Sequence, residues 1–319
     1  MKLGFIRLVH QAEWIVNVVL VPKKDGKVRM CVNFRDLNKA YPKDDFPLPH
    51  IDVSIDNTTG SALMFLMDGF LGYNQIKMAP IDMTKTTFTT EWRIYCYMVM
   101  PFELKNVGAT YQRMAIDLLH DMMNNKVEVY VDDMIVESKD RESHITNLRK
   151  FFERIGEYKR RLNPHKCAFG VTVGKLLGFL VSDRGIEVDP SKTTTILDML
   201  PPKSEKEIRG FLGGLQYISR YVTKLTFTCE PIFKLLRKNE PHTWNDECQK
   251  AFELIKEYLL HPPILVPPES GKPLLHYLSI IEDAVGSMLA QEDGDKNERV
   301  VFYLSKRFHN YETRDTPIP

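Results

Sequence analysis

Two adjacent carboxylates, Asp132 and Asp133, interrupt the apolar stretch "VEVYVDDMIV" at residues 127–136. Burying an isolated charge is costly, so a pair of charges in such a stretch needs partners or a function. A second apolar stretch, "ALMFLMD", ends in another carboxylate, Asp68. If both stretches are strands, their ends supply hard oxygen ligands of the kind that Mg²⁺ prefers. Paired divalent ions can clamp the attacking and leaving oxygens of a phosphoryl displacement.

The local geometry of the Asp pair follows from strand alternation. Successive side chains of a strand point to opposite faces, so both aspartates can enter one site only if a tight turn separates two strands. Aspartate favours turns, and the strand pattern resumes at residues 134–136. We therefore expect a hairpin in which Asp132 faces Asp68 and Asp133 assists. The alternative is an ordinary hairpin with polar tip residues, although Asp-Asp without Gly or Asn makes a poor tip.

A second feature is a basic hairpin near the start of the chain. Residues 15–21 and 28–34 have the composition of strands, and "PKKDGK" between them contains Asp25-Gly26, a strong hairpin signal. The three prolines of residues 41–52 predict an extended connector after this hairpin.

The remaining elements must position these features. Further strands are predicted at residues 95–102 and 167–188, and a helix at 109–123. A second amphipathic helix is predicted at residues 142–162, with an apolar stripe of Ile145, Leu148, Phe152 and Ile155. A separate helical unit is expected at about residues 189–260, with caps at Ser204 and Asn245. A Pro-rich linker, residues 261–273, then leads to a β-rich end.

Composition sets the broad class of protein. A chain of 319 residues favours two or three domains. With 43% hydrophobic and 27% charged residues and a formal net charge of +1, the chain has a globular composition and no global basic signal for nucleic acid. Five cysteines without a CxxC motif fit a reduced, intracellular protein. No apolar run is long enough to cross a membrane, and no signal-peptide cleavage site follows residues 14–21.

Several blocks of the chain, taken in order, resemble reverse transcriptases of gypsy-type LTR retrotransposons of plants. "YVDD" at residues 130–133 and "MDGFLGYNQI" at residues 67–76 carry the resemblance at the aspartates. The other blocks are "VPKKDGKVRMCVNFRDLNKAYPKDDFPLPHID", "EWRIYCYMVMPFELKNVGATYQRM", "LNPHKCAFGV", "GKLLGFLVSDRGIEVDPSK" and "IRGFLGGLQYISRYV". The resemblance covers nearly the whole chain.

The resemblance implies an α+β fold, a right-hand polymerase followed by a partial RNase H-like α/β domain. The implied domains are fingers at 1–43 and 76–106, palm at 44–75 and 107–184, thumb and connection at 185–260, and the truncated RNase H-like domain at 261–319. The implied activity is that of an RNA-directed DNA polymerase, which adds dNTPs to a primer 3′-OH on an RNA or DNA template. The implied cofactor is a pair of Mg²⁺ ions, with Mn²⁺ as a substitute.

The resemblance also assigns residues to the chemistry of this reaction. The metal-binding aspartates of the family match Asp68, Asp132 and Asp133. The fingers hairpin that grips the incoming triphosphate matches Lys23, Lys24 and Arg29, and several phosphate charges do need fixed cations.

Four further residues are assigned to substrate recognition. Tyr73 matches the aromatic residue that excludes a ribose 2′-OH, and Gln112 lies on the palm helix that faces the template-primer. Leu177 and Gly178 match the primer grip, where glycine lets the backbone approach the primer phosphates. For Tyr73 and Gln112 the alternatives are a packed aromatic ring and a solvated helix residue.

The chain departs from the family pattern at several positions. Glu103 replaces the Gly of "PFGLKNA" and adds bulk and negative charge near the nucleotide. Arg93 replaces the Gly of an "EWG" turn, which removes a permissive backbone conformation. Asn33 and Leu71 replace Asp and Ser, and the chain starts late relative to the family. These departures support a second hypothesis, a catalytically decayed transposon-derived fragment with only weak nucleic-acid binding.

The last residues resemble the start of an RNase H-like domain. Alignment on "AVG" at 284–286 puts its first catalytic aspartate at Ser279 and its next acidic position at or beyond Pro319. We therefore expect RNase H activity to be absent. The expected partners are a template with its primer, dNTPs and other domains of a pol polyprotein, with no membrane. The expected location is intracellular, in a cytoplasmic virus-like particle or the nucleus.

Overall fold

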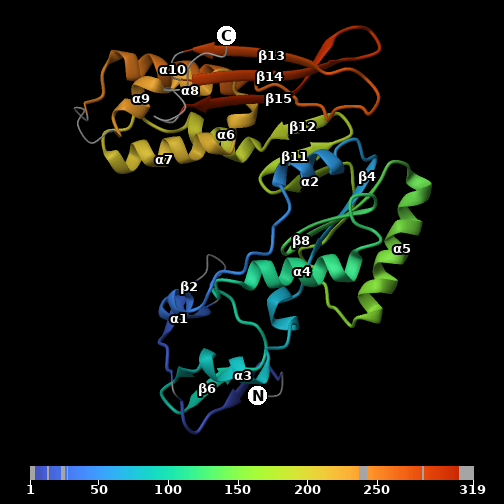
Figure 1. Ribbon diagram of the computed structural model, residues 1–319, viewed down its shortest axis with the longest axis vertical. Helices are drawn as coiled ribbons and strands as arrows, with labels where there is room; N and C mark the ends of the chain where they lie inside the picture. Colours follow the sequence, from blue (N-terminus) through green and yellow to red (C-terminus); the bar gives the residue numbers. More distant parts are fainter. Residues whose placement is uncertain are drawn as a thin grey trace, which may run out of the picture. The chain divides into compact units, whose positions relative to one another are not determined.

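The computed structural model describes residues 4–12, 14–22, 26, 28–236, 243–281 and 284–308 (Figure 1). The chain divides into two compact units. The first unit comprises residues 1–54 and 62–171, and the second comprises residues 55–61 and 172–319. Both contain helices and sheets, so the mixed α and β composition predicted from the sequence is confirmed. The finer division into fingers, palm, thumb and RNase H-like domain stays a prediction.

The first unit is built on an antiparallel sheet with the strand order β7-β8-β4-β9, whose bounds are Val127–Tyr130, Asp133–Ser138, Leu63–Asp68 and Ala168–Val171. Helices α4 (Val107–Leu119) and α5 (Arg141–Glu157) pack against these strands (Figure 1). Their shared core includes Phe65, Met67, Leu119, Val127, Val129, Val136 and Phe151. The predicted strand ending in Asp68, the Asp hairpin and the first helix are therefore confirmed.

The buried face of helix α5 overlaps the predicted apolar stripe only in part. Ile155 is buried and Leu148 packs against the core, as predicted. Ile145 and Phe152 are 65% and 39% exposed, so their predicted place in the stripe is wrong. The buried side chains are His144, Asn147, Phe151 and Ile155. The polar end of β8 explains this choice, because Ser138 Oγ lies 3.0 Å from both His144 Nδ1 and Asn147 Nδ2. Buried polar groups with hydrogen-bond partners are tolerated in a core, whereas a hydrophobicity pattern treats them as surface residues.

Both ends of α5 follow local rules. Asp140 caps the first turn, with its Oδ1 accepting a hydrogen bond from Ser143 N at 2.7 Å. The helix ends at Glu157, before residues 158–162, which were predicted to be helical. Lys159 has a φ of +53°, a left-handed conformation that cannot continue an α-helix.

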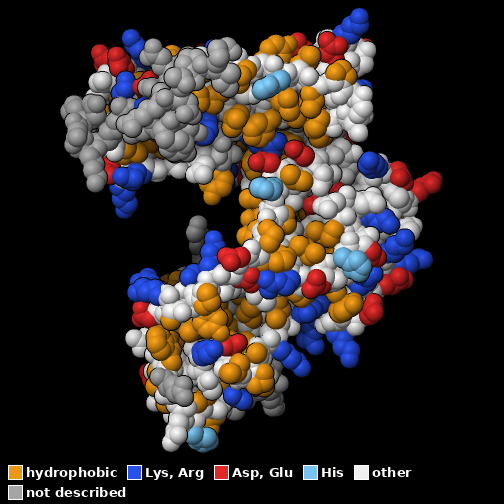
Figure 2. Space-filling view, in the orientation of Figure 1, with side chains coloured by type: hydrophobic (Ala, Val, Ile, Leu, Met, Phe, Trp, Pro, Cys, Tyr) orange, Lys and Arg blue, Asp and Glu red, His pale blue; other side chains and the backbone are white. Residues whose placement is uncertain are grey.

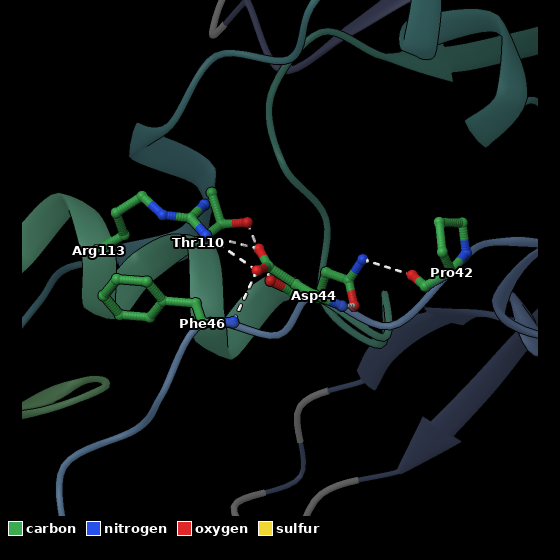
Figure 3. Close-up of polar contacts among 6 residues, drawn as sticks. Pro42, Asp44, Phe46, Thr110 and Arg113 are labelled. Atoms are coloured by element: carbon green, nitrogen blue, oxygen red, sulfur yellow. Dashed lines mark hydrogen bonds and ion pairs between the residues drawn. The ribbon is translucent and has the colours of Figure 1, made fainter.

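The extended connector predicted from its prolines is present, and it is pinned to the start of α4 (Figure 3). Asp44 accepts hydrogen bonds from the Arg113 guanidinium at 2.9 and 3.0 Å and from Phe46 N at 3.0 Å. Asn106 accepts from Asp44 N and donates to Pro42 O, each at 3.0 Å. The Phe46 N–H and the Arg113 side chain hold the pKa of the Asp44 carboxyl below its ordinary value.

The rest of the first unit contains the predicted hairpin of β2 (Val18–Pro22) and β3 (Val28–Val32), which pair antiparallel. A second sheet has the order β1-β6-β5, with bounds Ile6–Leu8, Ile94–Tyr97 and Phe88–Thr89. The short helices are α1 (Arg35–Ala40), α3 (Pro80–Met83), η1 (Gly72–Gln75) and η2 (Thr84–Thr86). Helix α2 (Ile51–Thr58) crosses the division between the two units, which falls after Ser54.

Two expectations for this region are corrected. β6 ends at Tyr97, so the strand predicted at residues 95–102 is shorter than expected. Arg93 is not among the described residues with positive φ, so its turn does not need the glycine-like conformation that the substitution was expected to lose.

The second unit combines two antiparallel sheets with helices. One sheet contains β10 (Val173–Leu176), β11 (Phe179–Ser182) and β12 (Gly185–Val188). The other contains β13 (Leu275–Ile281), β14 (Ala284–Glu292) and β15 (Glu298–Arg307). The helices are α6 (Pro190–Leu197), α7 (Glu205–Gln216), η3 (Ser219–Tyr221), α8 (Leu225–Thr228), α9 (Glu230–Lys234) and α10 (Asp246–Leu260).

Both predicted helix caps are confirmed. Ser204 forms a capping box with Glu207 at the start of α7, and Asn245 Oδ1 accepts from Cys248 N at the start of α10. The predicted linker at residues 261–273 is partly integrated into the unit, because Leu265 is fully buried and pairs with Ile186 of β12.

The sheet of β13, β14 and β15 carries an exposed apolar surface (Figure 2). Leu278 and Leu304 both lie opposite Ser287 in the strand register, and Ile280 lies opposite Val285 on the same face. These three side chains are exposed. No helix among the described residues is both long and apolar enough to cross a membrane.

Candidate active site

The three aspartates predicted from the sequence meet at one end of the β4–β8 strand pair. Asp68 is the last residue of β4 and lies directly opposite Asp133, the first residue of β8. Side chains opposite each other in an antiparallel pair project from the same face. Asp133, rather than Asp132, is therefore the direct neighbour of Asp68 in the register, which reverses the order expected from alternation.

The reversal arises in the turn between β7 and β8. Tyr130 pairs with Asp133, so Val131 and Asp132 form a two-residue turn. Val131 has a φ of +53°, which breaks the regular alternation of side chains. A left-handed conformation costs a non-glycine residue about 1–2 kcal/mol, so the surrounding structure must hold this turn in place.

Gln112 on α4 provides that support. Its Nε2 donates to Val129 O at 2.8 Å, and its Oε1 accepts from Val131 N at 2.6 Å. The Gln112 side chain is fully buried. Burial contradicts the alternative of a solvated helix residue, and the two engaged amide ends give Gln112 a positioning role for this turn. Its predicted place facing the template-primer stays a prediction.

Removing the Gln112 amide should damage the turn. In Gln112→Ala, Val129 O and Val131 N lose their partners in a buried setting, and each unsatisfied group costs about 1–3 kcal/mol. We expect the thermal unfolding midpoint to fall clearly, as measured by circular dichroism. The control is Asp117→Ala on the exposed face of the same helix, which should leave the midpoint nearly unchanged. A Gln112→Ala midpoint equal to that of the control would contradict the clamp.

Asp132 sits against the backbone of η1. A Cβ added to Gly72 would lie 2.8 Å from Asp132 Oδ1 and 3.0 Å from Tyr111 Cε2, so only glycine leaves room for this carboxylate. The Tyr73 hydroxyl donates a hydrogen bond to the Asp132 carboxylate. Asp132 Oδ1 is buried and has no hydrogen-bond partner in the protein.

The electrostatics of the cluster favour a bound cation. Burial raises the pKa of Asp132, and the charges of Asp68 and Asp133 raise it further. Burial and the charge of Asp68 raise the pKa of Asp133 in the same way. Burial and the charge of Asp132 raise the pKa of the Tyr111 hydroxyl to about 12. The carboxylates therefore repel one another in a partly desolvated setting.

One cation of the protein already contacts the cluster. Lys166 Nζ lies 2.9 Å from Asp68 Oδ2. The sequence analysis did not name Lys166 as a site residue. The feature that could have pointed to it is its place in the family-like block "LNPHKCAFGV".

The fit of the site to a divalent metal rests on its donor set. Within the described part of the chain, no three or more His, Cys, Asp or Glu side chains are grouped closely enough to form a ready-made metal site. The buried Asp132 Oδ1 without a partner, together with mutually repelling carboxylates, nevertheless matches what an oxygen-ligated divalent ion needs. The residues present therefore fit such an ion.

Tyr73 is a packed aromatic residue. Its ring makes edge contacts with Phe102 and Tyr111, at centroid distances of 5.2 and 5.4 Å. The alternative of a packed aromatic ring therefore describes the surroundings of Tyr73. The Tyr73 hydroxyl also makes a hydrogen bond to Asp132. Its predicted role against a ribose 2′-OH is untested.

The other predicted residues fall either outside the described side chains or in the second unit. Lys23 and Lys24 lie outside the described residues, and for Arg29 on β3 only the backbone is described. Leu177 and Gly178 form the turn between β10 and β11 in the second unit, with φ values of +51° and +92°. Two positive φ values are typical of a type I′ hairpin turn, in which glycine carries no penalty.

Structural comparison finds the same fold in foamy viral protease-reverse transcriptases. One structure in complex with double-stranded DNA matches 99% of this chain and 55% of that chain, with a TM-score of 0.87 and 22% identity. Another, in complex with an RNA/DNA hybrid, matches 99% of this chain and 42% of that chain, with a TM-score of 0.83 and 22% identity.

Sequence comparison agrees. The Tf2-3 and Tf2-7 transposon polyproteins of Schizosaccharomyces pombe are 29% and 28% identical over 302 residues, which are 93% of this chain. The chain spans 23% of the length of those polyproteins.

Family models match most of the chain. Residues 244–318 match the RNase H-like domain found in reverse transcriptase. Residues 21–213, which include all three aspartates, match the model for reverse transcriptase (RNA-dependent DNA polymerase). The chain therefore belongs to the reverse transcriptase family.

Proposed function

We propose that this chain is an RNA-directed DNA polymerase that adds dNTPs to a primer 3′-OH. The observation that carries the proposal is the meeting of Asp68, Asp132 and Asp133 at one end of β4 and β8, within a chain of the reverse transcriptase family. Two of the similar solved structures hold double-stranded DNA and an RNA/DNA hybrid, which supports a template-primer duplex as the partner.

Reverse transcriptases use divalent metal ions, and we propose two Mg²⁺ ions here, with Mn²⁺ as a substitute. Asp68 and Asp132 would hold them, and Asp133 would assist. When bound, the ions supply charge stabilisation to the reacting oxygens of the phosphoryl transfer. The chain itself fixes the carboxylates: Gln112 holds the turn of Asp132, and the Gly72 backbone sets how close Asp132 can approach.

The substrate contacts follow the sequence-based assignments as proposals. Lys23, Lys24 and Arg29 would grip the triphosphate of the dNTP. The Tyr73 ring would exclude a ribose 2′-OH, and its contacts with Phe102 and Tyr111 support a fixed ring position. The Leu177–Gly178 turn would approach the primer phosphates, and its tight backbone supports this role.

The wider context is also a proposal. The transposon polyproteins support an origin in an LTR retrotransposon, and we propose the gypsy type of plants, joined to other polyprotein domains. The proposed location is a cytoplasmic virus-like particle or the nucleus. We further propose that the β13–β15 sheet has no RNase H activity, because Ser279 stands where its first carboxylate would be.

The test of polymerase function is primer extension on poly(rA)/oligo(dT) with labelled dTTP. The chain should extend the primer when Mg²⁺ or Mn²⁺ is present and should stop when EDTA is added. Absence of extension under all metal conditions would favour the second candidate, a decayed fragment.

One observation gives that second candidate weight. Glu103 has a φ of +73°, a left-handed conformation that suits glycine. The loop is held there by Asn38, which donates to Glu103 O and accepts from Lys105 N, both at 2.8 Å. The chain therefore keeps a glycine-type backbone at a position where the side chain is Glu.

Replacing Glu103 with glycine should stabilise the protein and raise extension. Strain relief of about 1–2 kcal/mol, less the extra freedom of glycine in the unfolded chain, gives a net gain of about 0.5–1 kcal/mol. We expect a higher unfolding midpoint and a severalfold higher extension rate. Glu91→Gly, at an exposed residue without positive φ, is the control and should not stabilise.

The pair of assays separates the two candidates. Extension by the unmodified chain ends the decay hypothesis. Extension only by Glu103→Gly identifies residue 103 as the lesion, and an unchanged midpoint in that variant would contradict the strain argument.

A further inference from the structure

The ion pair between Lys166 and Asp68 is built into the fold. Asn163 N donates to Asp68 O at 2.8 Å, and Lys166 N donates to Asn163 O at 3.0 Å. A turn that is hydrogen-bonded to the backbone of Asp68 therefore delivers the lysine to that residue's own carboxylate. The backbone of this turn therefore positions Lys166 beside Asp68, and the contact does not depend on the length of the lysine side chain alone.

The charge of Lys166 acts on the whole cluster. Lys166 Nζ donates a hydrogen bond to Asp68 Oδ2 at 2.9 Å, and the charge of the lysine also favours the charged forms of Asp132 and Asp133. The Lys166 side chain is 64% exposed, so its ammonium group can move into water at little cost, whereas the Asp68 side chain is only 23% exposed.

We propose that Lys166 is a resident counter-cation of the aspartate cluster and that a divalent metal ion must displace its ammonium group from Asp68 in order to bind. The proposal rests on the proposed metal-binding role of Asp68 and Asp132. An ammonium group and a metal ion on the same carboxylate would lie within about 5 Å of each other, where like charges repel. Lys166 therefore offsets one negative charge of the cluster and raises the metal concentration needed to fill the site.

The direct test measures Mn²⁺ binding by the decrease in the electron paramagnetic resonance signal of free Mn²⁺, without any turnover. Lys166→Ala should bind Mn²⁺ about threefold to tenfold more tightly than the unmodified chain, as expected for the loss of one competing, partly exposed ion pair. Lys166→Arg keeps a cation beside Asp68 and should bind within about twofold of the unmodified chain.

Two further variants make the result specific. Lys139→Ala removes the same charge beyond the opposite end of β8, about 20 Å away along the strand, and should leave Mn²⁺ affinity unchanged. Asp132→Asn should abolish the binding and so identifies the site that is being measured.

The outcomes separate the inference from the proposed function. Equal Mn²⁺ affinity in Lys166→Ala and the unmodified chain overturns the counter-cation while leaving the metal site in place. Equal tightening in Lys139→Ala also overturns it, because net charge alone then explains the effect. If Asp132→Asn binds Mn²⁺ as the unmodified chain does, the metal site itself is refuted and the inference fails with it.

Discussion

Asp132→Asn will reduce primer extension by about 10²- to 10³-fold or more, while the protein stays folded. The substitution keeps the shape of the side chain and an oxygen to accept from the Tyr73 hydroxyl. It removes the charge of the carboxylate whose buried Oδ1 has no partner in the protein. An amide is a much weaker ligand for a divalent ion than a carboxylate, so the reaction loses its charge stabilisation.

Stability should change in the opposite direction. The pKa of Asp132 in the folded chain is raised by burial and by Asp68, so the folded state disfavours the charged form. Stability therefore rises as pH falls from neutral through that raised pKa, and the neutral Asn gains this benefit at every pH. We expect an unfolding midpoint at pH 7 at or above that of the unmodified chain, and a weaker dependence of the midpoint on pH.

The matched control is Asp117→Asn, an exposed carboxylate on α4. It should keep full extension activity and an unchanged midpoint. Extension by Asp132→Asn at the rate of this control would remove Asp132 from the reaction and, with it, the assignment of the cluster.

Gly72→Ala is expected to have the second largest effect. The added Cβ would meet Asp132 Oδ1 at 2.8 Å and Tyr111 Cε2 at 3.0 Å, both closer than normal contacts allow. Tyr111 is a buried core residue, so the carboxylate is the group that must shift. A displacement of about 1 Å at a catalytic group costs about 10²-fold in rate. We expect primer extension to fall by that factor.

Gly108→Ala provides the control for this prediction. Gly108 lies in the same unit, on α4, and an added Cβ there would meet nothing within 4 Å. It should retain activity and be slightly more stable, since alanine favours helix over glycine. If Gly72→Ala extends primers as well as Gly108→Ala, close approach at residue 72 does not set the position of Asp132.

The sequence predicted those parts of the site that show as a local pattern of residue types along the chain. Asp68 and the Asp pair stand out because charges end or interrupt apolar strands, and the caps at Ser204 and Asn245 follow local rules. The relation between Asp68 and Asp133 could not be predicted in the same way. It depends on the left-handed φ of Val131, and valine is among the residues least expected to adopt it.

The other residues that the sequence did not predict correctly depend on contacts with distant parts of the chain. His144 and Asn147 are buried because Ser138, on a strand, offers them hydrogen bonds, so an apolar stripe drawn from α5 alone finds Ile155 and Leu148 but not these two polar residues. From the sequence alone, Gln112 is expected on the surface of α4. Its burial follows only from its two backbone partners on β7 and in the following turn. Lys166 reads as a surface charge until the turn that carries it is seen to bond to Asp68.

The two hydrogen bonds of Gln112 have a consequence for comparing sequences of the reverse transcriptase family. One end of the side chain donates and the other accepts, at a fixed reach from α4. Glutamate offers only acceptors, asparagine is one methylene shorter, and leucine or methionine offers neither bond. A change at this position would remove the support of the aspartate turn even where "YVDD" is intact. The residue at position 112 therefore carries information about the turn that a search for "YVDD" alone does not use.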